Sequence, residues 1–475
     1  MRKLMLVLSA LMVASMLLAA CGSPATPAPV DEAPATEAPA ATDEAPATEA
    51  PSTEGPIEIR WFIGLGAGGN PEEVEKEQAF VDEFNAKYGD KYKLVMDVVQ
   101  NATAYDVLKT QIASGDVPDI VGPVGVRGLW SFEGAWMDLA PYVESTGYDV
   151  SDFNPALIDF YKLGPQGQVG LPFAIYPSAL WYNIDLFDEA GIAYPPHKYG
   201  DAYEDGDAWD YAKLRELAMQ LTFDENGNAP GSADFDPENI TQFGYDAMWT
   251  DIRGKWTFFE AGSFVGADGS AAMPDTWREA AHWYYDGMWK DYFIPNDNYV
   301  NSDLLAQGNT FSSGNVAMSP IHTWYTCCAG EVNWDLAAIP SYDGNTTAKM
   351  HADTFAILKG TKNPDAAFEV LTLLLGDMAP QLLEVYGAFP ARESLQDSAL
   401  EKMQTNFPNA DLQVFIDGIN YPDNPNHESG MPNFLKSSDT YTAFASLIQT
   451  TPGLDLDAEI DKLITDLDAV FKEQE

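Results

Sequence analysis

The stretch Ser114-Gly115-Asp116-Val117-Pro118-Asp119-Ile120-Val121 decides the fold expected for this chain. It predicts the end of a helix over 105–113, because glycine readily adopts left-handed backbone conformations and proline cannot continue a helix. Asp119 to Val121 then form a short apolar run that predicts a buried strand. The stretch is therefore interpreted as a helix-to-strand step inside an α/β unit.

The segments on the N-terminal side extend this unit. We expect a strand over 57–62, a glycine-rich turn over 64–69, a helix from near Pro71 and a second strand over 92–98. The order β-α-β-α-β favours an open α/β sheet that binds ligands at the carboxyl ends of its strands. Further helices are expected over 211–220, 277–289, 366–375 and 456–471, with surface insertions over 199–210 and 222–239.

The N-terminus resembles a targeting signal. Arg2 and Lys3 precede an apolar run that ends in Leu18-Ala19-Ala20-Cys21, which resembles a bacterial lipobox. We therefore expect a signal peptide over 1–20, lipid attached to Cys21, and a position on the outer face of the cytoplasmic membrane. An ordinary secretory signal is the alternative. Residues 21–56 repeat Ala, Pro, Thr and acidic residues, and predict a disordered tether.

Charge limits the ligands of the remaining body of about 420 residues, which is long enough for two lobes. The chain has a formal charge of −48, and 66 acidic against 23 basic residues remain after Ile57. Nucleic acid is therefore excluded as a partner, because phosphate contacts need clustered Lys and Arg. A neutral ligand suits this charge best.

Four motifs in order resemble the extracellular solute-binding proteins of ABC importers, in the carbohydrate-binding family that includes the maltodextrin-binding proteins. They are 114–120, then Gly170-Leu171-Pro172 with Trp181-Tyr182-Asn183-Ile184-Asp185-Leu186-Phe187, then Phe311-Ser312-Ser313-Gly314-Asn315-Val316-Ala317-Met318, and last Gly387-Ala388-Phe389-Pro390-Ala391-Arg392. The insertion at 199–206 departs from the family pattern.

The resemblance implies two α/β lobes, a hinge that the chain crosses several times, and a ligand cleft between the lobes. We expect the first crossing near Tyr176, the return near Asp353 and the last crossing near Leu395. Lobe 1 would then comprise 57–175 and 354–395, and lobe 2 would comprise 176–353 and 396–475.

A sugar site needs aromatic faces for its C–H patches and planar polar groups for its hydroxyls. The candidate aromatic residues are Trp324, Tyr176 and the pair Trp249 and Trp256, with burial in a core as the alternative for each. The polar candidates are Arg127, at the end of a strand, and His351 and Asp353, at the return crossing. Arg392 and Tyr441 are further candidates carried over from the family.

The remaining cysteines, Cys327 and Cys328, are adjacent, so they form either a vicinal disulfide or two free thiols. Residues 224–228 begin like a calcium loop, but Ala229 and Phe235 occupy positions that need Gly and Glu. A turn is expected there, and no metal or cofactor is expected in the chain.

The expected function is a lipid-anchored, non-enzymatic and monomeric receptor that binds a sugar or oligosaccharide and delivers it to the transmembrane subunits of an ABC permease. The alternative is a secreted glycoside hydrolase, which needs two carboxylates about 5 to 10 Å apart. No Gly-x-Ser-x-Gly or His-Glu-x-x-His motif occurs in the sequence.

Overall fold

The computed structural model describes residues 55–69 and 71–473. The signal peptide (1–20), Cys21 and all but the last two residues of the expected tether lie outside the described residues. The described strands join into one mixed sheet in the order β2-β1-β3-β9-β4-β7-β6-β5, with β10 and β8 paired to β4. The predicted α/β class is thus confirmed.

The first elements follow the predicted β-α-β-α-β order. They are β1 (Ile57–Ile63), α2 (Pro71–Tyr88), β2 (Tyr92–Val98), α3 (Asn101–Ser114) and β3 (Ile120–Gly125). β1 is parallel to both β2 and β3. Gly115 ends α3 in the left-handed conformation, with φ of 76°. The sequence signal that opened this unit therefore acts as expected.

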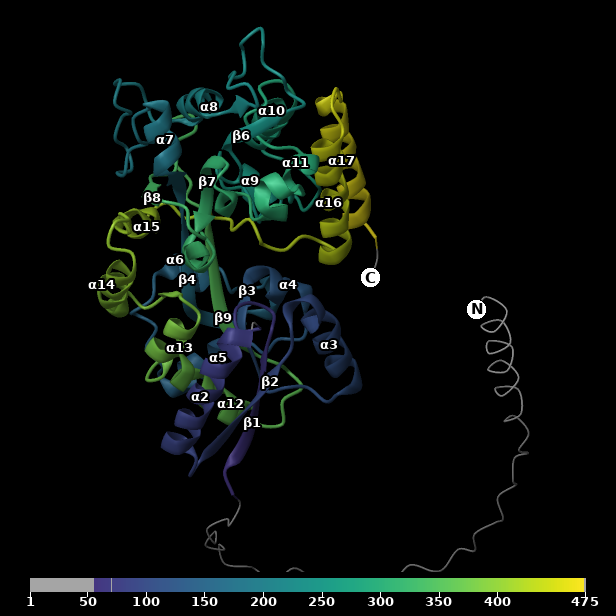
Figure 1. Cartoon of the computed structure of the whole chain (residues 1–475). Helices are drawn as coiled ribbons and strands as arrows, with labels where there is room; N and C mark the ends of the chain where they lie inside the picture. Colours follow the sequence, from purple (N-terminus) through teal and green to yellow (C-terminus); the bar gives the residue numbers. More distant parts are fainter. Residues whose placement is uncertain (1–54, 70, 474–475) are drawn as a thin grey trace, which may run out of the picture. The chain divides into compact units, whose positions relative to one another are not determined.

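Two long strands connect the lobes. β4 (Gly170–Asn183) pairs with β9 (Met350–Ile357) as far as Pro177, and from Ser178 onward it pairs with β7 (Val316–His322) and β8 (Trp334–Ala337). Figure 1 shows β4 and β9 between the group that holds α2 and α12 and the group that holds α7, α8 and α10. One continuous strand thus belongs to both halves of the sheet and forms part of the hinge.

The crossings expected near Tyr176 and Asp353 fall on β4 and β9 and remain predictions. β4 changes partners between Pro177 and Ser178, next to Tyr176. β9 is already paired with β4 at Met350, three residues before Asp353. Tyr176 lies opposite His351 in this register, so two candidate residues occur at one level of the hinge.

Lobe 1 is completed by short elements after β3 and by a group after β9. They are α4 (Val126–Ser131), α5 (Ala140–Thr146), α6 (Pro155–Asp159), η1 (Gly164–Gln166), α12 (Pro364–Leu375), α13 (Ala379–Val385), β10 (Phe389–Pro390) and η5 (Glu393–Leu395). α14 (Gln396–Asn406) and α15 (Gln413–Gly418) then lead toward lobe 2. Two apolar clusters form the lobe 1 core, one including Trp61 and Phe355 and the other Phe62 and Trp136.

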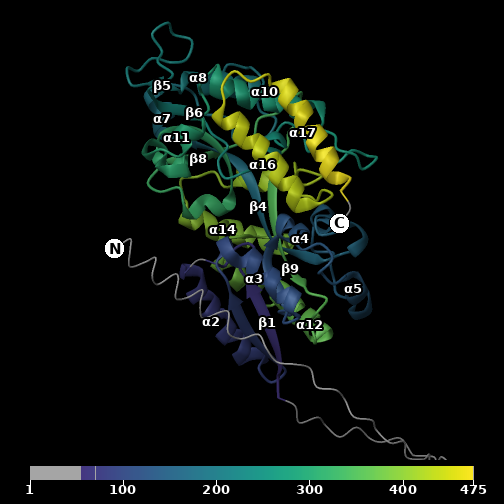
Figure 2. The same ribbon diagram turned by 90° about the vertical axis from the view of Figure 1, so that its right-hand side faces the viewer.

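Lobe 2 packs its helices around β7 and the parallel strand β6 (Ile240–Tyr245). Its remaining elements are α7 (Ile184–Ala190), α8 (Tyr211–Gln220), β5 (Phe223–Asp224), α9 (Ile252–Trp256), α10 (Asp275–Trp289), α11 (Asp297–Val300), η2 (Asp303–Gly308), η3 (Phe311–Ser313), η4 (Thr323–Cys327), α16 (Phe434–Thr450) and α17 (Leu456–Phe471). The antiparallel helices α16 and α17 lie side by side (Figure 2) and contribute to the largest apolar cluster.

The two expected insertions form hydrogen-bonded surface segments. Lys213 of α8 is buried and reaches back to Asp205 and Asp207 at 2.8 and 2.9 Å. The Asp224 carboxylate accepts backbone N–H groups of Asn226, Asn228 and Asp236. Those bonds organise a turn, as predicted for residues 224–228.

Among the described residues, no single helix is long and apolar enough to cross a membrane. α12 and α13 meet that criterion only when taken together as a pair, bent by 70°. Leu371 and Leu374 of α12 are fully buried in the lobe 1 core.

Candidate functional site

A row of nearly parallel rings lies at the hinge. Trp249 stacks on Trp324 with centroids 5.7 Å apart and planes 13° apart, and Trp324 stacks on His322 at 5.7 Å. His322 stacks on His351 at 4.0 Å, and His351 on His427 at 5.1 Å. The rings come from four segments distant in sequence, so the hinge assembles them into one site.

The two tryptophans give this row an apolar face. Trp249 is 47% exposed, and its indole N–H donates to the carbonyl of Gly308 at 2.9 Å. Its φ of 52° is uncommon for a residue with a side chain. Trp324 is half-buried on η4 and packs against apolar clusters of both lobes. The pair provides a broad aromatic surface at the boundary between the lobes.

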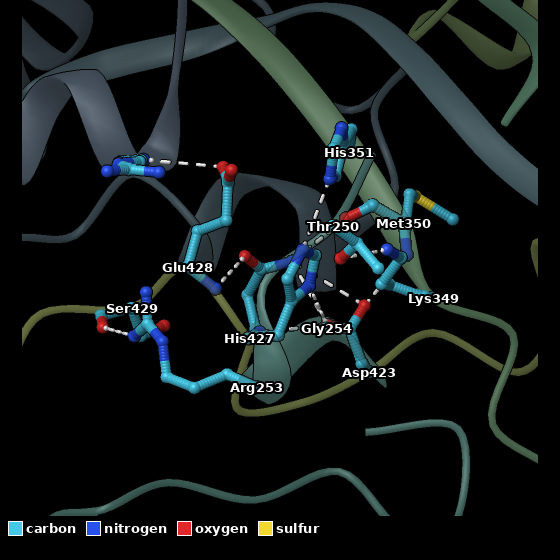
Figure 3. A network of polar contacts seen from close by, with 12 residues as sticks. Thr250, Arg253, Gly254, Lys349, Met350, His351, Asp423, His427, Glu428 and Ser429 are labelled. Carbon is cyan, nitrogen blue, oxygen red and sulfur yellow. Dashed lines mark hydrogen bonds and ion pairs between the residues drawn. The ribbon is translucent and has the colours of Figure 1, made fainter. Parts of the chain in front are cut away.

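Polar groups surround the histidine end of the row, as Figure 3 shows. His427 Nδ1 lies 2.6 Å from the fully buried carboxylate of Asp423, and His427 Nε2 lies 3.2 Å from His351 Nε2. Burial lowers the pKa of His351 to about 3, so its ring is neutral at physiological pH. Glu428 follows His427 directly and accepts the backbone N–H of Arg127, from lobe 1, at 3.4 Å.

A second polar group lies in lobe 2. The Tyr441 hydroxyl donates to Asp251 at 2.9 Å, and Arg253 donates to the carbonyl of Ser429 at 2.9 Å. Burial acts to raise the pKa of Asp251, but the Arg253 guanidinium and the Gly254 N–H outweigh burial and lower this pKa to about 2. Asp251 is therefore an ionised acceptor beside Tyr441.

Lys349 lies next to this group. Its ammonium donates to Thr250 Oγ1 at 2.7 Å. Burial lowers the pKa of Lys349 to about 8, while the carboxylates of Asp251, Asp423 and Glu428 oppose that shift. Lys349, the residue immediately before β9, thus adds a hydrogen-bond donor to this group.

Lobe 1 contributes Asp353, Tyr176 and the glycine-rich loop. A Cβ at Gly66 would lie 3.2 Å from Asp353 Oδ2, so the absence of a side chain lets the loop approach this carboxylate. Burial raises the pKa of Asp353 to about 7, and the negative charge of Glu428 adds to this effect. Tyr176 is buried in the lobe 1 core. Asp353 and Tyr176 thus line the base of the site rather than its surface.

The glycine-rich loop also packs on a buried carboxyl of α2. Glu77 is fully buried and accepts the Tyr386 hydroxyl at 2.8 Å, and a Cβ at Gly68 would lie 2.3 Å from Glu77 Oε1. Burial raises the pKa of Glu77 from 4.5 to about 7, although the Tyr386 hydrogen bond opposes this. Between pH 4.5 and 7 the folded state therefore holds one more proton than the unfolded state.

Glu77→Gln should remove this pH dependence. Glu77 should contribute about 3 kcal/mol to the fall in wild-type stability between pH 4.5 and 7, beside the fall that buried Asp353 causes, because ionised Glu77 is costly to bury. Urea unfolding of both proteins at pH 4 and pH 8 measures this effect. The free energy of unfolding of the variant, relative to that of the wild type, should be higher at pH 8 than at pH 4. Glu75→Gln, at an exposed position on the same helix, is the matched control and should follow the wild type. Equal pH dependence of Glu77→Gln and the wild type would contradict a buried, protonated Glu77.

Two candidate residues require correction. Trp256 is 1% exposed and packs against Phe264 and Trp277 in the lobe 2 core, so its ring has no surface to offer a ligand. The guanidinium of Arg392 donates to the carbonyl of Leu375, to Asp152 and to the Tyr148 hydroxyl. Arg392 therefore fastens parts of lobe 1 together and does not face the hinge site.

The other candidates lie close to one another. Tyr441 contacts Asp251, Arg127 lies beside Glu428, and His351 lies within the ring row next to Trp324. Asp423, His427 and Glu428 were not predicted, because they occur in a loop without periodic apolar residues. The dipeptide His427-Glu428 was the one local signal available.

Cys328 is disulfide-bonded in the structure. It lies four residues after Trp324, at the end of η4. The pairing with Cys327, expected as one of two alternatives, remains a prediction.

Pockets lie on both sides of this hinge region. One of about 460 Å³ is lined by Tyr105 and Arg127 of lobe 1 and by Phe434 and Ser438 of α16. Another of about 710 Å³ reaches from Thr326 of η4 to Phe389 and Phe407. Two α/β lobes that share strands, with an aromatic and polar site at their junction, define the class of two-lobed binding proteins.

Comparison with known proteins agrees with this class. Residues 68–379 match the model of a family described as bacterial extracellular solute-binding protein. The chain belongs to this family, and the predicted resemblance to solute-binding proteins is confirmed. A protein described as a putative binding protein from Brucella abortus (strain 2308) is 25% identical over 394 residues, which cover 75% of this chain and 86% of the relative.

Solved structures share the fold. An ABC substrate-binding protein from Listeria monocytogenes, solved with cycloalternan, superposes with a TM-score of 0.67 at 18% identity, covering 88% of this chain and 100% of the other. A maltose/maltodextrin-binding domain from Bdellovibrio bacteriovorus, bound to maltotriose, gives a TM-score of 0.62 at 16% identity, covering 88% and 100%. The two-lobed architecture expected from the sequence is thus confirmed.

Proposed function

We propose that this protein captures a carbohydrate at the hinge site and delivers it to an ABC-type permease. The observation that carries the proposal is the parallel pair of exposed Trp249 and half-buried Trp324, close to the polar residues His351, Glu428 and Arg127. Aromatic faces cover the C–H patches of a sugar, and planar polar groups bind its hydroxyls. Proteins with the same fold are named for cycloalternan and maltotriose, which supports a carbohydrate ligand.

The proposal includes the anchor and the working cycle. Lipid on Cys21 would hold the body at the outer face of the cytoplasmic membrane, with residues 22–56 as a spacer. Since site residues come from both lobes, a ligand that contacts both favours the arrangement in which the lobes approach each other. A monomer suffices for this function, because the described lobes supply both sides of the site.

A ligand screen tests the proposal. Mono- and oligosaccharides, polyols, amino acids and short peptides are compared by thermal shift on the mature chain. A sugar at 100 times its dissociation constant should stabilise the folded state by about 2.7 kcal/mol. Stabilisation by amino acids or peptides, with no response to any sugar, would contradict the carbohydrate assignment.

Trp249→Ala should weaken sugar binding by about 5- to 30-fold. The change removes an exposed stacking face, and covering such a face stabilises a complex by about 1–2 kcal/mol. Isothermal titration with the best sugar of the screen measures the loss. Tyr194→Ala, an exposed aromatic residue near α7 and outside the ring row, is the control and should bind as the wild type does. Unchanged affinity in Trp249→Ala would remove Trp249 from the site.

One observation keeps the hydrolase alternative in view. Oxygens of Asp353 and Glu428 lie 3.4 and 3.6 Å from one point, the Cβ that a side chain at Gly125 would carry, so they are at most about 7 Å apart. Pairs of carboxyl groups at such separations cleave glycosidic bonds in hydrolases. Incubation with oligosaccharide and assay of reducing ends separates the functions. A binding protein releases none, whereas release that Glu428→Gln abolishes would favour the hydrolase.

A further inference from the structure

Two histidines and a glutamate converge at the hinge. Ligand atoms of His351, His427 and Glu428 all lie within 4.8 Å of one another. His427 is buried, and the other two side chains are half-buried. We propose that these three residues bind one divalent transition-metal ion, and that this ion is Zn²⁺ or a metal of similar coordination chemistry. The proposed metal site shares His351 and Glu428 with the proposed sugar site but does not depend on sugar binding, and it revises the expectation that the chain holds no metal.

The spacing of the two ring nitrogens fits a shared ion. His351 Nε2 and His427 Nε2 are 3.2 Å apart. Two nitrogens, each about 2.0–2.1 Å from Zn²⁺ and separated by a tetrahedral angle, lie about 3.3 Å from one another. The dashed contact in Figure 3 marks this pair of nitrogens.

The contact of His427 with Asp423 leaves Nε2 of His427 free of that carboxylate. Nδ1 of His427 lies 2.6 Å from the carboxylate of Asp423. A neutral imidazole that donates Nδ1–H to a carboxylate keeps its lone pair on Nε2. A carboxylate that orients a histidine in this way is the usual second partner of a metal-binding imidazole. His351 would coordinate through Nε2 in the tautomer that carries its proton on Nδ1.

Backbone contacts hold the ligands in place before any ion binds. Asp423 accepts the backbone N–H of Met350 at 2.8 Å and that of His427 at 2.9 Å. Asn426 Nδ2 donates to the carbonyl of Met350 at 3.0 Å. The loop that carries His427 and Glu428 is thereby fastened to the strand that carries His351. Such rigid support reduces the entropy lost on coordination.

The ligand set selects the ion. Two imidazoles and one carboxylate suit Zn²⁺, with Co²⁺, Ni²⁺ and Cu²⁺ as chemical relatives, whereas Ca²⁺ and Mg²⁺ prefer oxygen ligands. Three protein ligands leave one tetrahedral position for water. Negative charge on Asp423 and Glu428 compensates the cation, with the Lys349 ammonium as the opposing charge nearby.

Zinc titration of the mature chain tests this proposal. The protein is stripped with a chelator and titrated calorimetrically with Zn²⁺ in the absence of sugar. One ion should bind per chain. His351→Ala and His427→Ala should each weaken binding at least about 100-fold, and Asp423→Asn, which acts through His427, about 10- to 100-fold. His282→Ala, which removes an exposed histidine of α10 paired with Asp457, is the matched control and should leave zinc binding unchanged.

A second variant and a second readout guard against loss of folding. Glu428→Gln keeps an oxygen to accept the Arg127 N–H but removes the charge, and should weaken zinc binding while circular dichroism stays unchanged. Cu²⁺ at His351 should quench Trp324, whose ring centroid lies 6.4 Å from that of His351, and Trp324→Phe should lose that part of the quenching. The zinc proposal would be overturned if the wild type bound no stoichiometric zinc, or if folded His351→Ala and His427→Ala bound zinc as tightly as the wild type. Neither result would contradict the proposal that the protein binds a sugar.

Discussion

Trp256→Ala should lower the free energy of unfolding by about 3–5 kcal/mol, the usual cost of removing a buried tryptophan. The ring is 1% exposed, with the rings of Phe264, Trp277 and Phe444 centred 6.0, 5.9 and 6.2 Å away. Truncation leaves a cavity that these large, interlocked rings cannot fill. Urea unfolding followed by circular dichroism measures the loss as a lower midpoint.

Trp249→Ala is the matched comparison, because it removes the same side chain seven residues earlier. Trp249 is 47% exposed, so the free energy of unfolding should change by no more than about 0.5 kcal/mol. Trp256→Ala should therefore lose stability, whereas Trp249→Ala should lose affinity for the sugar. A Trp256→Ala protein that unfolds like the wild type but fails to bind sugar would return Trp256 to the ligand site.

The elements that the sequence predicted well carry their own start and stop signals. α8 begins after Asp210, whose carboxylate accepts the N–H groups of Ala212 and Lys213, and the helix spans the expected residues 211–220. α17 spans the expected 456–471 and begins after Asp455, which accepts the N–H of Ala458. Local hydrogen bonding and apolar spacing fix such elements without help from the rest of the chain.

The site was only partly predictable, because long-range pairing assembles it. His351 was expected from its place on a crossing strand, and the structure sets it beside His427, 76 residues later. No periodicity links the two, and the loop that carries His427 is held by contacts with Met350. Register between distant segments decides which polar groups meet, and a single sequence does not contain that register.

Trp256 and Arg392 were predicted to bind ligand, and their positions also depend on contacts between distant parts of the chain. Trp249 and Trp256 lie in one aromatic stretch, yet Trp249, which precedes α9, is 47% exposed and Trp256, at the end of α9, is 1% exposed. Arg392 was carried over from a family motif, yet its partners Tyr148 and Asp152 lie about 240 residues away in sequence. The sequence shows that the residue types needed for a sugar site are present. It does not show which individual tryptophan or arginine residues lie at that site.

Arg253 is a buried cation of lobe 2 with an acidic side chain beside it. Its side chain is 3% exposed, with Nε 3.6 Å from Asp251 Oδ2. Its remaining partners, the carbonyl of Ser429 and the hydroxyl of Tyr441, are neutral. The Asp251 carboxylate therefore supplies the only negative charge in direct contact with this guanidinium among the described residues.

Asp251→Asn should lower the free energy of unfolding by about 3 kcal/mol, because a buried guanidinium then loses its counter-charge. Asparagine retains an oxygen for the Gly254 N–H, so the start of α9 stays capped and the loss reports on charge. Asp457→Asn, which breaks an exposed pair with Arg278, is the control and should cost no more than about 1 kcal/mol. Adding Arg253→Met to Asp251→Asn should restore part of the stability in urea unfolding, since neither charge is then left alone. Additive losses in the double variant would show that the two side chains stabilise the fold independently.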